Sequence, residues 1–286
     1  MSTIFDRLRG RRLTGVGTIG LIIVSLVVIL AIIGPYISPH DAIQHNLKAR
    51  YAPLGYTDPE HGTYWLGTDQ LGRDILSRII AGCRVSVIVS IFAVFIAGSI
   101  GVSYGLIAGF VGGWLDQVMM RIADALLSIP FIVLVVAISG VVGAGIVTLI
   151  LILGFTGWVT YARVTRGEVL VAKELDYVIA ATVVGQSKVR IMFQHILPNV
   201  MSSAVVLAAL QVGVTIIAES SLSFLGLGVQ PPSVTWGLML ADGRASIGSA
   251  WWMTTFPGIA ITIVVLGVVF LGDWMRDVLD PRLRGE

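Results

Sequence analysis

The feature that most restricts the fold of this chain is a set of long runs without any charged residue. No Asp, Glu, Lys or Arg occurs between Leu13 and Pro39, between Val85 and Leu115, or in the stretch 125–162. A helix needs about 20 mostly apolar residues to cross the hydrocarbon core of a bilayer. The first two runs therefore predict one membrane crossing each, and the third run, of 38 residues, is long enough for two.

The composition agrees with a membrane location and excludes several other classes. Hydrophobic residues make up 56% of the chain and charged residues 13%, whereas soluble proteins carry about 25% charged residues. A net charge of +2 is too small to indicate nucleic-acid binding. The single cysteine, Cys83, excludes an internal disulfide, and the four histidines lack ligand spacing, so no metal is expected. The chain has no phosphate-binding loop, so we expect no cofactor in it and no ATP hydrolysis by it alone.

The uncharged runs predict an all-α membrane protein with six transmembrane helices. Residues 1–12 form a short basic N-terminus, and residues 13–39 form the first helix, a retained signal-anchor because no small-residue cleavage site follows it. Residues 40–84 are the longest hydrophilic loop. The core, 85–286, then holds five more helices: one at about 85–112, two within 125–162, and two at about 199–221 and 254–272. The turn between the third and fourth helices is expected at Gly140, Gly143 and Gly145.

The distribution of basic residues predicts the orientation in the membrane. Six crossings place both termini on one side, and short loops rich in Lys and Arg stay in the cytoplasm. Of the 19 basic residues, 13 fall in segments on the side of the N-terminus. We therefore expect both termini inside the cell, the loop 40–84 outside, and the loop 163–198 in the cytoplasm.

Four glycines in the second predicted helix recur at every fourth position. They are Gly101, Gly105, Gly109 and Gly113. This spacing gives a helix a flat face against which a neighbouring helix can pack closely. The repeat therefore predicts a packing surface rather than a ligand site.

The segment Asp176–Asn199 is amphipathic and lies between two predicted membrane helices. Its apolar positions fall on two helical stripes, the first formed by Tyr177, Ala180, Ala181 and Val184 and the second by Val189, Met192, Phe193 and Ile196. Gly185 separates the stripes, Ser187 is placed to cap the second helix, and Pro198 closes the segment. The pattern predicts two short helices that meet at a glycine. Such a unit either fits a groove on a partner protein or lies on the lipid surface.

The alanine, glycine and Leu-Pro positions of this segment resemble the EAA loop of permease subunits in binding-protein-dependent ABC importers. That pattern has Glu-Ala-Ala, a glycine four residues after the second alanine, and a later Ile-x-Leu-Pro. Here Ile179 replaces the glutamate and His195 occupies the isoleucine position. The resemblance implies that the segment couples the chain to an ATPase, through Tyr177, Ala180, Ala181, Gly185, His195, Leu197 and Pro198.

Three further stretches resemble the C-type permease of dipeptide, oligopeptide and nickel importers. They are GTDQLGRDILSR at 67–78, SFLGLGVQPPSVTWG at 223–237 and GDWMRDVLDPRLRG at 272–285. The resemblance implies a type I ABC importer permease fold in the bacterial inner membrane and pairing with a second, similar permease. It also implies two cytoplasmic ATPase subunits, which bind ATP and Mg²⁺, and an external substrate-binding protein. The expected substrate is a short peptide, with nickel or a metal chelate as the alternative.

The roles of several charged and aromatic residues are less directly indicated by the sequence. Glu219, near the outer end of the fifth helix, either faces the translocation pathway or pairs with a neighbouring helix. Asp69, Arg73 and Asp74 either brace the outer loop or contact the binding protein. Local pairing is expected for Arg121 with Asp124 and for Asp273, Arg276 and Asp277, while Trp236, Trp251 and Trp252 suit an outer interfacial belt.

Two other classes of function agree less well with the sequence. A proton-coupled carrier working alone favours acids and histidines at mid-membrane depth together with paired broken helices, and neither is clear in the sequence. An intramembrane enzyme needs a nucleophile and a base at a workable spacing within the apolar spans, and no span carries such a pair.

Overall fold

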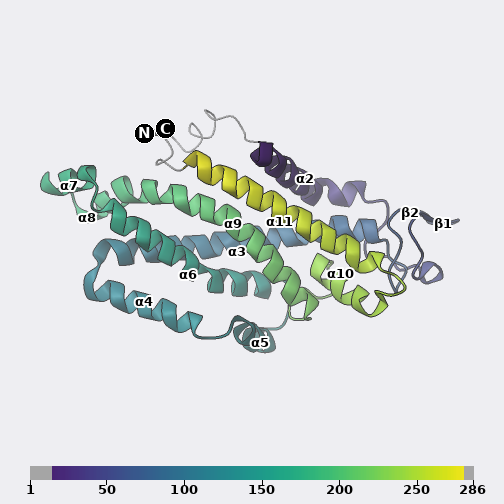
Figure 1. The fold of residues 1–286 in the computed structure, drawn as a ribbon. Helices are drawn as coiled ribbons and strands as arrows, with labels where there is room; N and C mark the ends of the chain where they lie inside the picture. The colour runs from purple at the N-terminus through teal and green to yellow at the C-terminus, as the bar shows by residue number, and fades with distance from the viewer. Residues whose placement is uncertain (1–14, 280–286) are drawn as a thin grey trace.

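The computed structural model describes residues 15–279, which form an elongated bundle of helices (Figure 1). The long helices are α2 (Gly15–Ile37), α3 (Ile75–Val111), α6 (Ile146–Ala172), α9 (Leu197–Phe224) and α11 (Trp252–Leu279). A further pair, α4 (Gly113–Leu127) and α5 (Phe131–Val142), is apolar enough to cross a membrane together. The described residues thus contain five continuous helices long enough to span, and six spans if this bent pair counts as one, against the six crossings that the sequence predicts. The basic stretch 1–12 and the arginines at 282 and 284 lie outside the described residues.

The helix boundaries differ from the predicted ones at the outer end of the second span. Helix α3 begins at Ile75, ten residues before the predicted start, so the end of the expected outer loop is helical. The carboxylate of Asp74 caps the helix, accepting hydrogen bonds from the Ser77 N–H at 2.8 Å and the Ser77 hydroxyl at 2.6 Å. A capped start of this kind supports a helix through Arg78 and Arg84, whose charges had marked the limit of the uncharged run.

The third span is broken, which the sequence analysis did not predict. Helices α4 and α5 are bent by 80° at the residues that join them, 128–130. Pro130 has no N–H to continue the hydrogen-bond ladder of α4, and its ring disfavours a helical residue before it. The predicted turn between the third and fourth spans is present at Gly143, which has a φ of 93°, and at Gly145, which precedes α6; it does not include Gly140, which lies within α5.

Three of the four spaced glycines lie against α6. A Cβ on Gly101 would be 2.3 Å from the carbonyl oxygen of Trp158, and one on Gly105 would be 2.3 Å from that of Ala162. A Cβ on Gly109 would be 2.9 Å from the Val169 side chain. Gly113 does not belong to this face, because α3 ends at Val111 and Gly113 starts α4 with a φ of 59°.

The first and last described helices pack side by side and run in opposite directions. Gly17 of α2 lies against Trp274 near the end of α11, and a Cβ on Gly20 would be 2.5 Å from the backbone nitrogen of Leu271. Further along α2, Gly34 contacts Ile80 of α3. Helix α2 is therefore held by α3 at one end and by α11 at the other.

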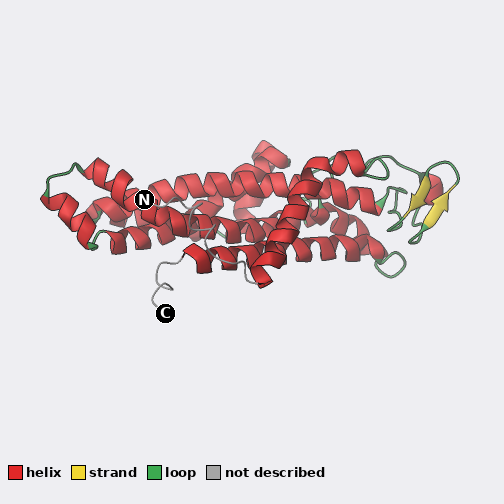
Figure 2. Ribbon diagram, turned by 90° about the horizontal axis from the view of Figure 1, so that it is seen from above, coloured by secondary structure: helices red, strands yellow, loops and turns green. Residues whose placement is uncertain are grey.

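Small elements gather at the two ends of the bundle (Figures 1 and 2). One end carries the hairpin β1 (Tyr56–Asp58) and β2 (Gly62–Tyr64), an antiparallel pair in which Tyr56 faces Tyr64, and helix α10 (Trp236–Gly243). The short helical turn η1 (Leu47–Ala49) lies with the hairpin between α2 and α3, and η3 (Arg244–Ser246) follows α10 between α9 and α11. The opposite end carries α7 (Asp176–Val183) and α8 (Lys188–Ile191).

The expected belt of interfacial tryptophans is wrong for two of its three members. Trp236 and Trp252 are buried in the hydrophobic core that joins α2, α3, α9, α10 and α11. Their indole N–H groups donate to the carbonyl oxygens of Ile79 and Thr68, each at 3.0 Å. Trp251 is 47% exposed. The apolar bodies of the two buried rings fill the core while their single donors are satisfied by backbone, which is the ordinary arrangement of a buried tryptophan.

Candidate functional site

The amphipathic segment forms an elbow at one tip of the bundle. Gly185 has a φ of 79°, a conformation that glycine adopts without strain, and its N–H donates to the carbonyl of Thr182 at 3.0 Å. The Ser187 hydroxyl caps α8 by accepting from the Arg190 N–H at 3.4 Å. Two helices thus meet at a glycine, as the sequence predicts.

The second helix of the elbow is not short. Helix α8 continues through a π-helical turn, η2 (Met192–Ile196), into α9, so that Lys188–Phe224 is one helix of 37 residues. Pro198 lies in the first turn of α9 and does not end the segment. A π turn widens the helix locally, and it stands where the missing N–H of the proline interrupts the ordinary ladder.

The helical face that packs on the bundle differs from the predicted stripe. Val178 and Ala181 are buried against α3, α6 and α9, in a cluster that includes Leu106 and Val169. Tyr177, Ala180 and Val184 face outward. Of the first predicted stripe, only Ala181 is buried, because α7 packs on the bundle through Val178 and Ala181.

Polar contacts tie α7 and the loop after it to the π turn and to the start of α9. The His195 imidazole is hydrogen-bonded to the Gln186 side chain at 2.9 Å, and the Asn199 amide donates to the Tyr177 hydroxyl. Leu197 packs beside the buried cluster that holds Val178. The residues that the resemblance assigned to coupling are therefore neighbours in space. The sequence analysis missed the partners Gln186 and Asn199, which no periodic pattern singles out.

The outward surface of the elbow is apolar. Val183 and Val184, next to Gly185, are 81% and 80% exposed. Val189 and Phe193 on the second helix are also more than half exposed. Large apolar groups that a chain leaves uncovered at one place indicate a surface for a protein or membrane partner.

At the opposite end of the bundle, a cluster of charges fastens the loop 40–74 to α10. Arg73 pairs with Asp69 at 2.6 Å and with Asp242 of α10 at 3.0 Å, and Arg78 reaches the same Asp242 at 3.1 Å. Arg78 is 1% exposed. The loop 40–74 is thereby fastened to α10, which supports the brace reading for Asp69 and Arg73. Asp74 contributes by capping α3.

The hairpin of the outer loop is held by Asp58. Its carboxylate accepts from the N–H groups of Glu60 at 2.9 Å and His61 at 3.0 Å, and the Asn46 amide donates to it at 3.1 Å. The Glu60 N–H, followed by the His61 side chain, holds the pKa of Asp58 well below its usual range. Hydrogen bonds to the ionised form are the cause, since they stabilise the carboxylate relative to the acid.

Glu219 is enclosed within the chain and faces α3. It is fully buried, and its carboxylate accepts hydrogen bonds from the hydroxyls of Ser223 at 2.8 Å and Ser86 at 3.0 Å. The Ser220 hydroxyl is a third, longer donor at 3.4 Å. These contacts support the pairing reading of Glu219, because a residue sealed by its own chain has no surface to offer to a pathway.

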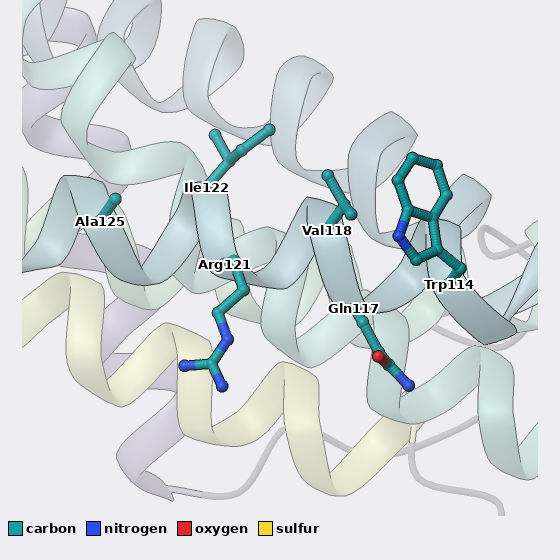
Figure 3. Close-up of a pocket in the computed structure, with 6 residues that line it drawn as sticks. All are labelled: Trp114, Gln117, Val118, Arg121, Ile122 and Ala125. Carbon is teal, nitrogen blue, oxygen red and sulfur yellow. The ribbon is translucent and has the colours of Figure 1, made fainter.

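The charges of α4 pair with α6 and not with each other. Asp116 forms two hydrogen bonds of 2.6 Å with Arg166, and Asp124 accepts from Arg163 at 2.6 Å. The expected local pair of Arg121 with Asp124 is therefore wrong, since Asp124 turns toward the neighbouring helix. A shallow hollow of about 380 Å³ lies along α4, lined by Trp114, Gln117, Val118, Arg121, Ile122 and Ala125 (Figure 3).

Comparison with known proteins decides the family. Residues 101–285 match the model of the binding-protein-dependent transport system inner membrane component. The chain belongs to this family. Residues 5–53 also match the N-terminal transmembrane domain of oligopeptide transport permease C. The permease is thus a multi-pass protein of the bacterial plasma membrane, and its role is that of a transport subunit.

Curated relatives cover nearly the whole permease. The dipeptide transport system permease protein DppC of Bacillus subtilis is 40% identical over 93% of this chain and 81% of its own length. The oligopeptide transport system permease protein OppC of the same species is 40% identical over 93% of this chain and 85% of its own. The glutathione transport system permease protein GsiD of Pectobacterium atrosepticum is 39% identical, over 91% and 85%.

Proposed function

We propose that this permease forms half of the translocation pathway of an ATP-driven importer of di- and oligopeptides. A second, homologous permease supplies the other half. Two ATP-binding subunits in the cytoplasm bind ATP and Mg²⁺ and carry out hydrolysis, and an external protein delivers the substrate. The exposed apolar elbow at Val183, Val184 and Gly185 carries the proposal, because it offers a helical unit of the kind that fits a groove on a partner.

The construction of the elbow suits transmission of motion. Tyr177 of α7 accepts a hydrogen bond from Asn199 of α9, and His195 of the π turn bonds Gln186 in the loop that follows α7. The π turn continues into α9. Closure of the ATPase pair moves the elbow, and α9 moves with it as one element. The pathway then changes between inward-open and outward-open states by rigid-body switching.

Peptides are the substrate class that the relatives favour. The named relatives transport dipeptides, oligopeptides and glutathione, which is itself a short peptide. None of the three names supports nickel, a metal chelate or a stand-alone proton-coupled carrier. The substrate class of this permease is accordingly proposed as short peptides.

One substitution pair tests the coupling role. Val184→Asp places a charge on the exposed elbow, and Ile247→Asp makes the same change at a residue that is 62% exposed at the other end of the molecule. In the complete importer, reconstituted in liposomes, Val184→Asp is expected to lower ATP-driven peptide uptake at least about tenfold. Ile247→Asp is expected to leave that coupling intact. Normal uptake by Val184→Asp overturns the proposed contact.

The orientation is tested separately by labelling. In a Cys83→Ser background, a cysteine introduced by Val184→Cys is expected to react with a membrane-impermeant maleimide in inverted membrane vesicles and not in intact spheroplasts. A cysteine introduced by Ile247→Cys is expected to show the reverse. Labelling of both from one side contradicts a transmembrane bundle, and a swap of the two patterns contradicts N- and C-termini inside.

A further inference from the structure

Charged residues of α4 and α6 lie at a depth where α3 has none. The Tyr104 hydroxyl of α3 donates to the Met119 carbonyl of α4 at 2.7 Å, which sets these residues level. Gly105 of α3 is level with Ala162 of α6. Residues 85–115 contain no charge, so Arg121, Asp124 and Arg163 stand beside an uncharged stretch of α3. Charges at such a depth face protein or water and not lipid tails.

These charges belong to a polar stripe along one face of α4. Gln117, Arg121, Asp124 and Ser128 follow one another at intervals of four, three and four residues, so they share a helical face, and all four are exposed. The other side of the helix, at Asp116 and Ala123, is buried against the bundle. The stripe is therefore left largely uncovered by its own chain, although Asp124 reaches Arg163 of α6 along its edge.

The stripe runs into the break between α4 and α5. Residues 128–130 at the break are exposed. Irregular backbone within a membrane is tolerated where it is covered by protein or lines a water-filled cavity, because lipid offers no hydrogen-bond partners. The break and the stripe point to the same conclusion: this face of α4 borders an aqueous passage.

Arg121 differs from the other charges of the stripe. Asp124 is paired with Arg163, and Asp116 with Arg166. Within residues 15–279, Arg121 makes no ion pair or hydrogen bond. Arg121 is one of the six residues that line the hollow, and in Figure 3 its side chain points to the same side of α4 as Gln117 and away from Ile122. An arginine side chain without a partner can hold a carboxylate with two parallel hydrogen bonds.

We propose that the polar stripe of α4 lines the translocation pathway and that Arg121 binds the C-terminal carboxylate of the peptide in transit. The inference rests on the proposed function. A linear peptide of any sequence carries this carboxylate, so the contact does not depend on side chains. Exposure of Arg121 to water keeps the contact weak, which a passage requires, because a substrate held tightly does not leave.

The test compares a peptide with a free C-terminus and the same peptide as a C-terminal amide. Uptake is measured in liposomes holding the complete importer, with the binding protein saturated by each form and that saturation verified by direct titration. The wild type is expected to transport the free acid about tenfold faster than the amide. Arg121→Gln is expected to lower the uptake rate of the free acid to that of the amide. Arg121→Lys is expected to retain a faster uptake of the free acid.

Arg84→Gln is the matched control, since Arg84 of α3 is another exposed arginine that forms no ion pair or hydrogen bond within residues 15–279. This variant is expected to keep the acid preference of the wild type. An unchanged acid-to-amide ratio in Arg121→Gln overturns the inference. The inference is also overturned if Arg121→Gln lowers the uptake of both peptide forms equally or fails to assemble with the other subunits. Either result assigns Arg121 to a contact between subunits. A wild type that transports neither form refutes the proposed function itself.

Discussion

The tight contact between α3 and α6 makes a quantitative prediction about Gly101. A Cβ at this position would lie 2.3 Å from the Trp158 carbonyl oxygen and 2.5 Å from the Tyr161 Cβ. An ordinary carbon–oxygen contact is about 3.3 Å, so the helices must separate locally by about 1 Å in Gly101→Ala. Backbone atoms form the obstacle, and no side-chain rotation relieves the overlap.

The expected loss follows from two opposed effects. Overpacking costs about 1–3 kcal/mol, and a clash with backbone falls in the upper part of that range, about 2–3 kcal/mol, whereas alanine is about 1 kcal/mol more favourable than glycine within a helix. The net free energy of unfolding of Gly101→Ala should therefore fall by about 1–2 kcal/mol. For a chain of this size, that corresponds to a decrease of about 3–6 °C in the apparent Tm.

The assay is thermal unfolding of the purified permease in detergent, followed by circular dichroism at one fixed scan rate. Gly98→Ala is the matched control, because the added Cβ would lie 3.5 Å from a ring carbon of Tyr161, an ordinary contact. Its Tm should equal or slightly exceed that of the wild type, since only the helix preference changes. A Tm for Gly101→Ala at or above that of Gly98→Ala would refute the close-packing argument.

Three further predictions concern the polar contacts. Asp242→Asn should lower the free energy of unfolding by about 2 kcal/mol, measured as a Tm shift, because the buried Arg78 loses one of its counter-charges. Glu219→Ala should cost about 2 kcal/mol and Glu219→Gln less, because glutamine still accepts one of the hydroxyl hydrogen bonds; equal losses contradict this. Asp58→Ala should speed amide exchange of residues 56–64 at pH 7. Because the pKa of Asp58 is depressed, its contribution is complete at neutral pH and is lost as pH falls through that lowered pKa, so wild-type protection should persist to about pH 4.

Local patterns in the sequence were sufficient for the spans and the elbow. A long uncharged run has one stable outcome in a bilayer, so the five continuous spans could be predicted directly. Gly185 was recognisable because an amphipathic pattern stopped and restarted around it, and the structure gives it a φ of 79°. The repeat of Gly101, Gly105 and Gly109 identified a packing face, although not its partner, α6.

Contacts between distant parts of the chain could not be read in this way. Arg78 and Asp242 are 164 residues apart, and nothing in the local sequence of either indicates the other. The break at Pro130 was hidden because apolar residues on both sides continue the run that marks a span. Trp252 resembled an interfacial residue because its burial depends on the loop carbonyl of Thr68, which only the folded loops bring close.

The packing of α2 has a consequence for the order of synthesis. Gly17 and Gly20 rest on Trp274 and Leu271, so the first membrane helix of the described chain meets this partner when nearly all of the sequence has been translated. At about 5–20 residues per second, some 250 residues take on the order of 12–50 s. During that interval the contact of α2 with α3, at Gly34 and Ile80, is available while the glycine face near its start has no partner. Completion of the bundle is thus deferred until the last span is inserted.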